Sequence, residues 1–169
     1  MKHPCSVFLL CALAACGGSG SGPAGPGLAP PTTTLPGPTP PGSVDNVTFA
    51  SLLNNVRIAN SAAPVAFDAR LASAAQNHAN DMLAQNYFSH TGLNGSSPGD
   101  RITAAGYNWR TYGENIAQGQ SSETTVLQAW TNSPGHHAND INPNFEDFGL
   151  GKAGTGSNAR WVLVLGAER

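Results

Sequence analysis

The sequence has only three cysteines, and all of them lie within its first 16 residues. The part of the chain that can fold, from Asp45 onward, therefore has neither a disulfide nor a thiolate metal site. Charge is also scarce, because Asp, Glu, Lys and Arg make up 11% of the residues and the net charge is −2. The few basic residues are not clustered, which argues against a nucleic-acid partner.

The N-terminal segment is interpreted as a targeting signal rather than as part of the folded domain. Its apolar run at 7–13 is too short to cross a bilayer, and small residues then lead to Cys16. This pattern resembles a bacterial lipoprotein signal, with cleavage after residue 15 and acyl chains such as palmitate on Cys16. An ordinary secretory peptide with incidental cysteines is the alternative. More than one acyl chain gives a stable membrane anchor, and Gly17 favours the outer membrane if the cell has two.

Residues 16–44 are predicted to form a disordered tether between the lipid and a domain that faces the periplasm or the outside. Between 17 and 44 the chain has eight prolines, many glycines and no charge. Such a segment cannot bury enough apolar surface to offset the entropy of ordering. The remaining residues, 45–169, are enough for one domain that buries about two-thirds of its unfolded surface.

Apolar spacing in the folded part predicts helices first and strands last. Helices are expected at 47–60, after Asp68, at 98–105, after Ser122 and, as a short turn, after Ser133. The alanines of the second helix allow close approach by a neighbouring element. Strands are expected at 145–152 and 160–166. Because 161–165 is apolar on both faces, that strand should lie between two layers, with helices on both sides of an α+β sheet.

Glu114 is the residue around which the functional prediction is built. It is the only formal charge between Arg110 and Glu123, and apolar residues follow it closely. A carboxylate in such a segment costs several kcal/mol unless it meets donors or a cation. We expect the imidazoles of His90 and His136 to meet it in one polar cleft. An imidazole near a helix start sees the positive end of the dipole, which favours neutral His136.

Two other residues have both a structural and a functional interpretation. His78 lies on the apolar face of the second helix, where a core histidine with a hydrogen-bond partner is favoured over a ligand. Ser97 is at the centre of a Gly-x-Ser-x-Gly match at 95–99. A nucleophile elbow needs a strand before the serine, whereas Ser97 followed by Pro98 is typical of a helix cap.

Five stretches, taken together with their order and spacing, resemble the bacterial branch of the CAP superfamily of cysteine-rich secretory, antigen 5 and pathogenesis-related 1 proteins. They are LNNVR at 53–57, AQNHANDM at 75–82, YFSH at 87–90, GENIA at 113–117 and WTNSPGH at 130–136. The resemblance implies a three-layer α-β-α sandwich and a cleft with two histidines and two acidic residues. His90, Glu114 and His136 match three of these four positions.

This chain departs from the family pattern beside the cleft. Ser133 is counted with the residues of the predicted cleft, because it stands where the second acidic residue of the cleft is expected. His137 and Asp140 stand where a basic and an aliphatic residue are expected. The missing acid puts a metal site of the eukaryotic type in doubt.

Three roles remain open for the predicted cleft. His90, Glu114 and His136 are adequate zinc ligands with open positions for water, which would suit a metal-dependent hydrolase of peptide or peptidoglycan. The protease signature His-Glu-x-x-His is absent, however. The same trio could instead be a hydrogen-bonded network that holds the third helix to the sheet. The resemblance implies binding of a lipid, cell-wall or protein ligand more securely than catalysis, so we expect a membrane-anchored, non-enzymatic binding module.

Overall fold

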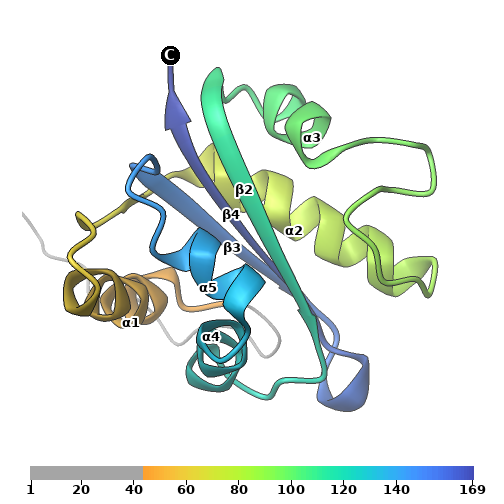
Figure 1. Cartoon of the computed structure of the whole chain (residues 1–169). Coiled ribbons are helices and arrows are strands. Elements are labelled where there is room, and N and C mark those ends of the chain that lie inside the picture. The colour runs from red at the N-terminus through yellow and green to blue at the C-terminus, as the bar shows by residue number, and fades with distance from the viewer. Residues whose placement is uncertain (1–43) are drawn as a thin grey trace, which may run out of the picture. The chain divides into compact units, whose positions relative to one another are not determined.

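The computed structural model describes residues 44–169, so the predicted signal at 1–15, the lipidation site Cys16 and the predicted tether up to residue 43 lie outside the described residues. A mixed sheet in the strand order β1-β3-β4-β2 forms the centre of this part of the chain (Figure 1). β1 pairs with β3 in parallel, and the other pairs are antiparallel. The elements are α1 Asn46–Ala59, β1 Ala66–Phe67, α2 Ala69–Ala84, α3 Pro98–Ala104, β2 Trp109–Gln118, α4 Glu123–Thr131, α5 Pro134–Asp140, β3 Asp147–Ala153, the 3-10 helix Gly156–Asn158 and β4 Arg160–Glu168.

Four helices begin at side-chain caps. Asp45 accepts hydrogen bonds from backbone N–H groups at the start of α1, and Asp68 does the same for α2. Ser97 and Ser122 cap α3 and α4 in the same way. Ser133 occupies the N-cap position of α5, directly before Pro134, as expected, but its side chain makes no capping hydrogen bond.

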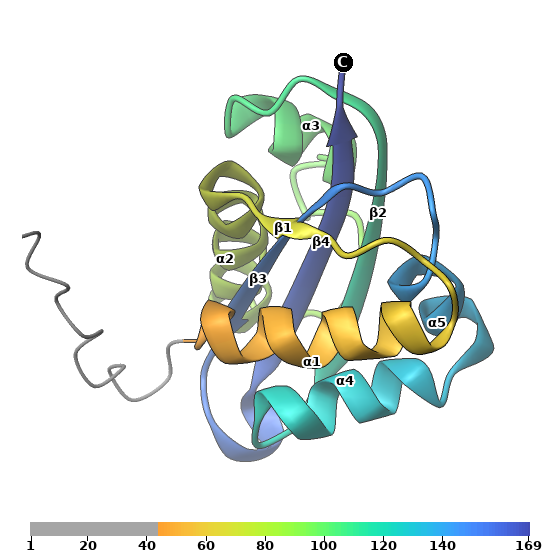
Figure 2. The ribbon, with the colours of Figure 1, turned by 90° about the vertical axis from the view of Figure 1, so that its left-hand side faces the viewer.

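The sheet lies between two layers of helices, as the apolar strand at 161–165 predicted. α2 and α3 cover one face, and α1, α4 and α5 cover the other (Figures 1 and 2). β4 is buried along nearly its whole length and contributes side chains to both cores. The α+β, three-layer prediction is confirmed. In the described part of the chain, no helix combines the length and the apolar composition that crossing a membrane requires.

The two faces of β2 meet different helices, and this alternation positions the candidate site. Tyr112 and Ile116 pack in the core under α2, whereas Ala117 packs in the core under α4. Successive side chains of a strand point to opposite faces. Glu114 therefore faces the α2–α3 layer, and Asn115 faces the layer that contains α5.

Candidate functional site

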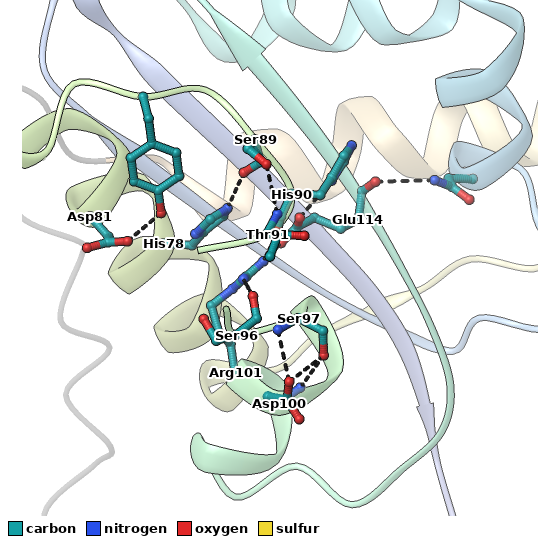
Figure 3. A network of polar contacts seen from close by, with 12 residues as sticks. His78, Asp81, Ser89, His90, Thr91, Ser96, Ser97, Asp100, Arg101 and Glu114 are labelled. Atoms are coloured by element: carbon teal, nitrogen blue, oxygen red, sulfur yellow. Dashed lines mark hydrogen bonds and ion pairs between the residues drawn. The ribbon is translucent and has the colours of Figure 1, made fainter. Parts of the chain in front are cut away.

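Glu114 is buried in the middle of β2, opposite Val164 of β4. Its side chain is only 3% exposed. Each oxygen of its carboxylate has a charged or polar partner (Figure 3): Oε2 accepts from Nη2 of Arg101 at 2.7 Å, and Oε1 accepts from Nδ1–H of His90 at 2.8 Å. The buried carboxylate is thereby compensated by donors, as a group in this environment must be.

Arg101 is the partner of Glu114 that the sequence analysis missed. From α3 its guanidinium also donates to the carbonyl oxygens of His90, at 2.9 Å, and Ser96, at 3.0 Å. One side chain thus connects α3, the loop before it and β2. This supports the interpretation of a network that holds the third helix to the sheet, with an arginine in place of one of the two predicted imidazoles.

Replacement of Glu114 by Gln is expected to lower the free energy of unfolding by about 2 kcal/mol. The reason is that Arg101, largely buried, keeps its charge and loses its carboxylate partner. The measurement is urea unfolding of the full chain. The matched control is Glu146→Gln, which breaks an exposed ion pair with Arg110 and should cost less than about 0.5 kcal/mol. Equal losses in the two variants would contradict a structural role for the buried pair.

His90 is oriented by Glu114 and remains open to solvent. Its side chain is 51% exposed. Because Nδ1 carries the hydrogen that faces the carboxylate, the neutral ring has Nε2 as an acceptor. A histidine held in one tautomer by an acid is suited to accept a hydrogen bond from a ligand or to bind a metal.

His136 lies on α5, across the edge of the sheet from Glu114. In residues 44–169 no hydrogen bond joins its ring to Glu114, and its backbone carbonyl accepts from Nδ2 of Asn115 at 3.0 Å. Burial and the nearby His90 both lower the pKa of His136. Neutral His136 is therefore favoured, as expected, although burial and a neighbouring imidazole are the causes. The structure places the two imidazoles near one another and brings only His90 into contact with the acid.

Behind His136, a second polar network is largely buried. Nδ2 of Asn115 also donates to Oδ1 of Asp140 at 2.9 Å, and Nδ2 of Asn139 donates to Oδ1 of Asn115 at 2.9 Å. From α1, Nη1 of Arg57 donates to the backbone carbonyl of Asp140 at 2.8 Å. These bonds fix α5, and with it His136, to β2 and α1. Asp140, where the resemblance led us to expect an aliphatic side chain, is thus part of this polar network.

The donors do not fit a three-ligand zinc site as they are arranged. Both oxygens of Glu114 are engaged by Arg101 and His90. Within residues 44–169, no three His, Cys, Asp or Glu side chains are grouped so that they could share a metal ion. The metal role of His90, Glu114 and His136 stays a prediction without a supporting contact.

The structural interpretations of His78 and Ser97 are confirmed. His78 is 1% exposed, and its Nε2–H donates to the carbonyl oxygen of Ser89 at 2.9 Å. Oγ of Ser97 accepts from the backbone N–H of Asp100 at 3.2 Å and donates to its carboxylate at 2.6 Å. Ser97 is thus engaged with Asp100 in a capping box, and no histidine of residues 44–169 is hydrogen-bonded to its hydroxyl, as it would be in a catalytic Ser–His pair.

Comparison with protein families and curated proteins gives a consistent result. The family model described as the cysteine-rich secretory protein family, CAP, matches residues 50–165. YkwD of Bacillus subtilis, described as uncharacterized, is 40% identical over 94 residues, which are 56% of this chain and 37% of that protein. YlbC, an uncharacterized membrane protein of B. subtilis, is 31% identical over 100 residues, or 59% of this chain and 29% of that protein. The chain thus spans only about a third of these relatives.

Solved structures extend the comparison to extracellular and surface proteins. An extracellular protein from Bacillus anthracis that contains an SCP domain is 30% identical with a TM-score of 0.68, over 72% of this chain and 40% of that one. An outer surface protein from Borrelia burgdorferi has a TM-score of 0.67 at 24% identity, over 76% of this chain and 99% of that one. The second likeness concerns the fold alone.

Proposed function

Because the chain belongs to the cysteine-rich secretory protein (CAP) family, we propose that it is an extracytoplasmic, non-enzymatic module that binds a cell-envelope component. The proposal places the domain at a membrane through lipid on Cys16. Two relatives, one described as extracellular and one as a membrane protein, support this location. The binding surface that we propose is the edge of the sheet at β2, where the imidazoles of His90 and His136 lie near one another.

The observation that carries the proposal is that both oxygens of Glu114 are engaged. A general base or a metal ligand needs a lone pair that can reach the reacting group. Here the carboxylate is buried between Arg101 and His90, so it positions the histidine and stabilises α3. Nε2 of His90 remains as an acceptor for a ligand. The metal-dependent hydrolase has no comparable support, since residues 44–169 contain no group of three His, Cys, Asp or Glu side chains that could hold a metal ion.

Binding to the envelope is tested with purified peptidoglycan sacculi as the probe. We expect the full chain to co-sediment with sacculi, and His136→Ala to weaken binding at least about tenfold through loss of a ligand contact. His137→Ala, the adjacent imidazole on α5, is the matched control and should bind as before. Wild-type protein that does not sediment with sacculi would refute the proposal, and steady release of soluble fragments would establish the hydrolase instead.

The lipid anchor is tested separately at Cys16. Cells that express the full chain are labelled with radioactive palmitate and fractionated. We expect label on the wild-type protein in the membrane fraction, because two or more acyl chains bind membranes stably. Cys16→Ser should carry no label and leave the membrane fraction. Label on the Cys16→Ser variant would show that the signal has been misinterpreted.

A further inference from the structure

The segment that carries His90 lies between the end of α2 at Ala84 and the start of α3 at Pro98, and it contains neither a helix nor a strand. Its backbone carbonyls therefore lack the partners that regular structure supplies. Three of the carbonyls accept hydrogen bonds from largely buried side chains of β4, α2 and α3 instead. The bonds run from Nε of Arg160 to Tyr87 at 3.3 Å, from Nε2–H of His78 to Ser89 at 2.9 Å, and from Nη2 of Arg101 to His90 at 2.9 Å.

His78 is a donor in a fixed position. It is 1% exposed, and burial lowers its pKa, so the ring is neutral and carries one hydrogen. That hydrogen is on Nε2, because the partner is a carbonyl oxygen. The ring of Tyr87 packs edge-on against the ring of His78 with the centroids 6.1 Å apart, and its hydroxyl donates to Asp81 of α2. Figure 3 shows the bond from His78 to Ser89 directly behind His90.

The imidazole of His90 depends on its own backbone for its orientation. The side chain is 51% exposed, and within residues 44–169 its ring makes one hydrogen bond, from Nδ1 to Oε1 of Glu114 at 2.8 Å. A shift of the backbone by about 1 Å would stretch this bond beyond hydrogen-bonding distance. The carbonyl that His78 holds belongs to the peptide group that joins Ser89 to His90. The buried histidine therefore fixes the point from which the exposed one projects.

We propose that His78 is a positioning residue for His90. Its bond to Ser89 holds the backbone so that Nδ1–H of His90 meets Glu114 and Nε2 stays free as an acceptor. The consequence for ligand binding rests on the function proposed above, in which His90 meets the ligand. Burial of an aromatic ring would be enough for a core residue, whereas positioning requires the N–H group. Substitutions of His78 can separate these two roles.

His78→Gln and His78→Asn form a matched pair, because the two amides differ by one methylene group. The amide nitrogen of Gln can reach the place of Nε2, whereas that of Asn reaches only the place of Nδ1. Nitrogen NMR of the full chain, at a mildly alkaline pH where an unperturbed imidazole is neutral, reports the tautomer of His90. We expect the Nδ1–H tautomer alone in the wild type and in His78→Gln, and a mixture of tautomers in His78→Asn. A single tautomer in His78→Asn, or a mixture in His78→Gln, would overturn the proposal.

Asn54→Ala is the control for a general loosening of the fold. Asn54 lies on α1, which covers the opposite face of the sheet, and its side chain also holds a backbone segment. It donates to the carbonyl oxygen of Val65 at 3.0 Å and accepts from the N–H of Val65 at 2.8 Å. Asn54→Ala should leave the tautomer of His90 unchanged, and a mixture in this variant would count against the proposal. If His78→Asn does not fold, His78→Leu takes its place, with the same mixture expected, because leucine fills the buried space without a donor.

Co-sedimentation of the same variants with sacculi tests the consequence for binding. We expect His78→Asn to weaken binding about two- to fivefold, because the competent orientation of His90 is then populated only part of the time. His78→Gln should bind like the wild type. If the wild type itself does not bind, the function proposed above fails, while the tautomer of His90 still decides whether His78 positions it. Undiminished binding by a His78→Asn protein with mixed tautomers would overturn the role of this positioning in binding.

Discussion

Gly149→Ala is expected to lower the free energy of unfolding by about 4 kcal/mol or more. Gly149 lies in β3, where a Cβ atom would stand 2.0 Å from the backbone nitrogen of Ala72 and 2.3 Å from the carbonyl carbon of Leu71. Both atoms belong to the backbone of α2, so no side-chain rotation relieves the clash. The helix must move away from the sheet and give up the packing of its buried face.

Gly135→Ala is the matched control for this substitution. A Cβ at Gly135, in the first turn of α5, meets nothing within 4 Å. Alanine is favoured over glycine in a helix, so stability should stay within about 1 kcal/mol of the wild type or rise slightly. The measurement is urea unfolding of the full chain. A loss of no more than about 1 kcal/mol in Gly149→Ala would mean that α2 and β3 are not in backbone contact.

The layers of the fold were predictable because periodicity and burial pattern are local properties of the sequence. The strand at 161–165, apolar on both faces, predicted the middle of the sandwich, and β4 is buried there. The alanines of α2 predicted a close neighbour but did not identify it. The partner is β3, whose Gly149 and Gly151 lie on one face of the strand, and this pairing is decided by the tertiary fold.

The candidate site was predictable only in part, because neighbouring residues of β2 face opposite sides of the sheet and meet different partners. The contact between His90 and Glu114 follows from the need of a buried carboxylate for donors. Arg101 gave no sequence signal, because a single arginine on a short helix acquires its partner through tertiary packing. Glu114 and Asn115 point to opposite faces of the strand. His136 therefore meets Asn115 through its backbone, and the expected bond to Glu114 is not formed.

Asp140 makes the stability of this domain depend on pH in a direction unusual for a carboxyl group. The residue is completely buried, Oδ1 accepts from Asn115, and Oδ2 has no hydrogen-bond partner in residues 44–169. Burial raises its pKa from 3.8 to about 7, while the Asn115 bond and the charge of Arg57 act in the opposite direction. The folded protein therefore keeps a proton that the unfolded chain releases above pH 4.

The sign of the effect follows from that difference in bound protons. Between about pH 4 and pH 7 the unfolded state binds fewer protons at this position than the folded state. The contribution of Asp140 to stability is complete below the unfolded pKa and decreases by up to about 1.4 kcal/mol per pH unit as the pH rises through this range. Over the whole range, the contribution of Asp140 to the free energy of unfolding falls by about 4 kcal/mol, and the fall is complete once the pH has passed the folded-state pKa of about 7.

Asp140→Asn isolates this contribution, because the amide keeps an oxygen for Asn115 and cannot ionise. The lowered pKa values of His78 and His136 act with the opposite sign, and they are present in both proteins. We therefore expect the stability of the wild type minus that of Asp140→Asn to fall steadily from pH 4 to pH 7, measured by urea unfolding across that range. Asp140→Leu introduces the aliphatic side chain that the family resemblance leads one to expect, and it cannot ionise either. The stability of the wild type minus that of Asp140→Leu should therefore fall from pH 4 to pH 7 in the same way. A difference that stays constant with pH would mean that Asp140 is ionised in the fold, with Arg57 as its buried counter-ion.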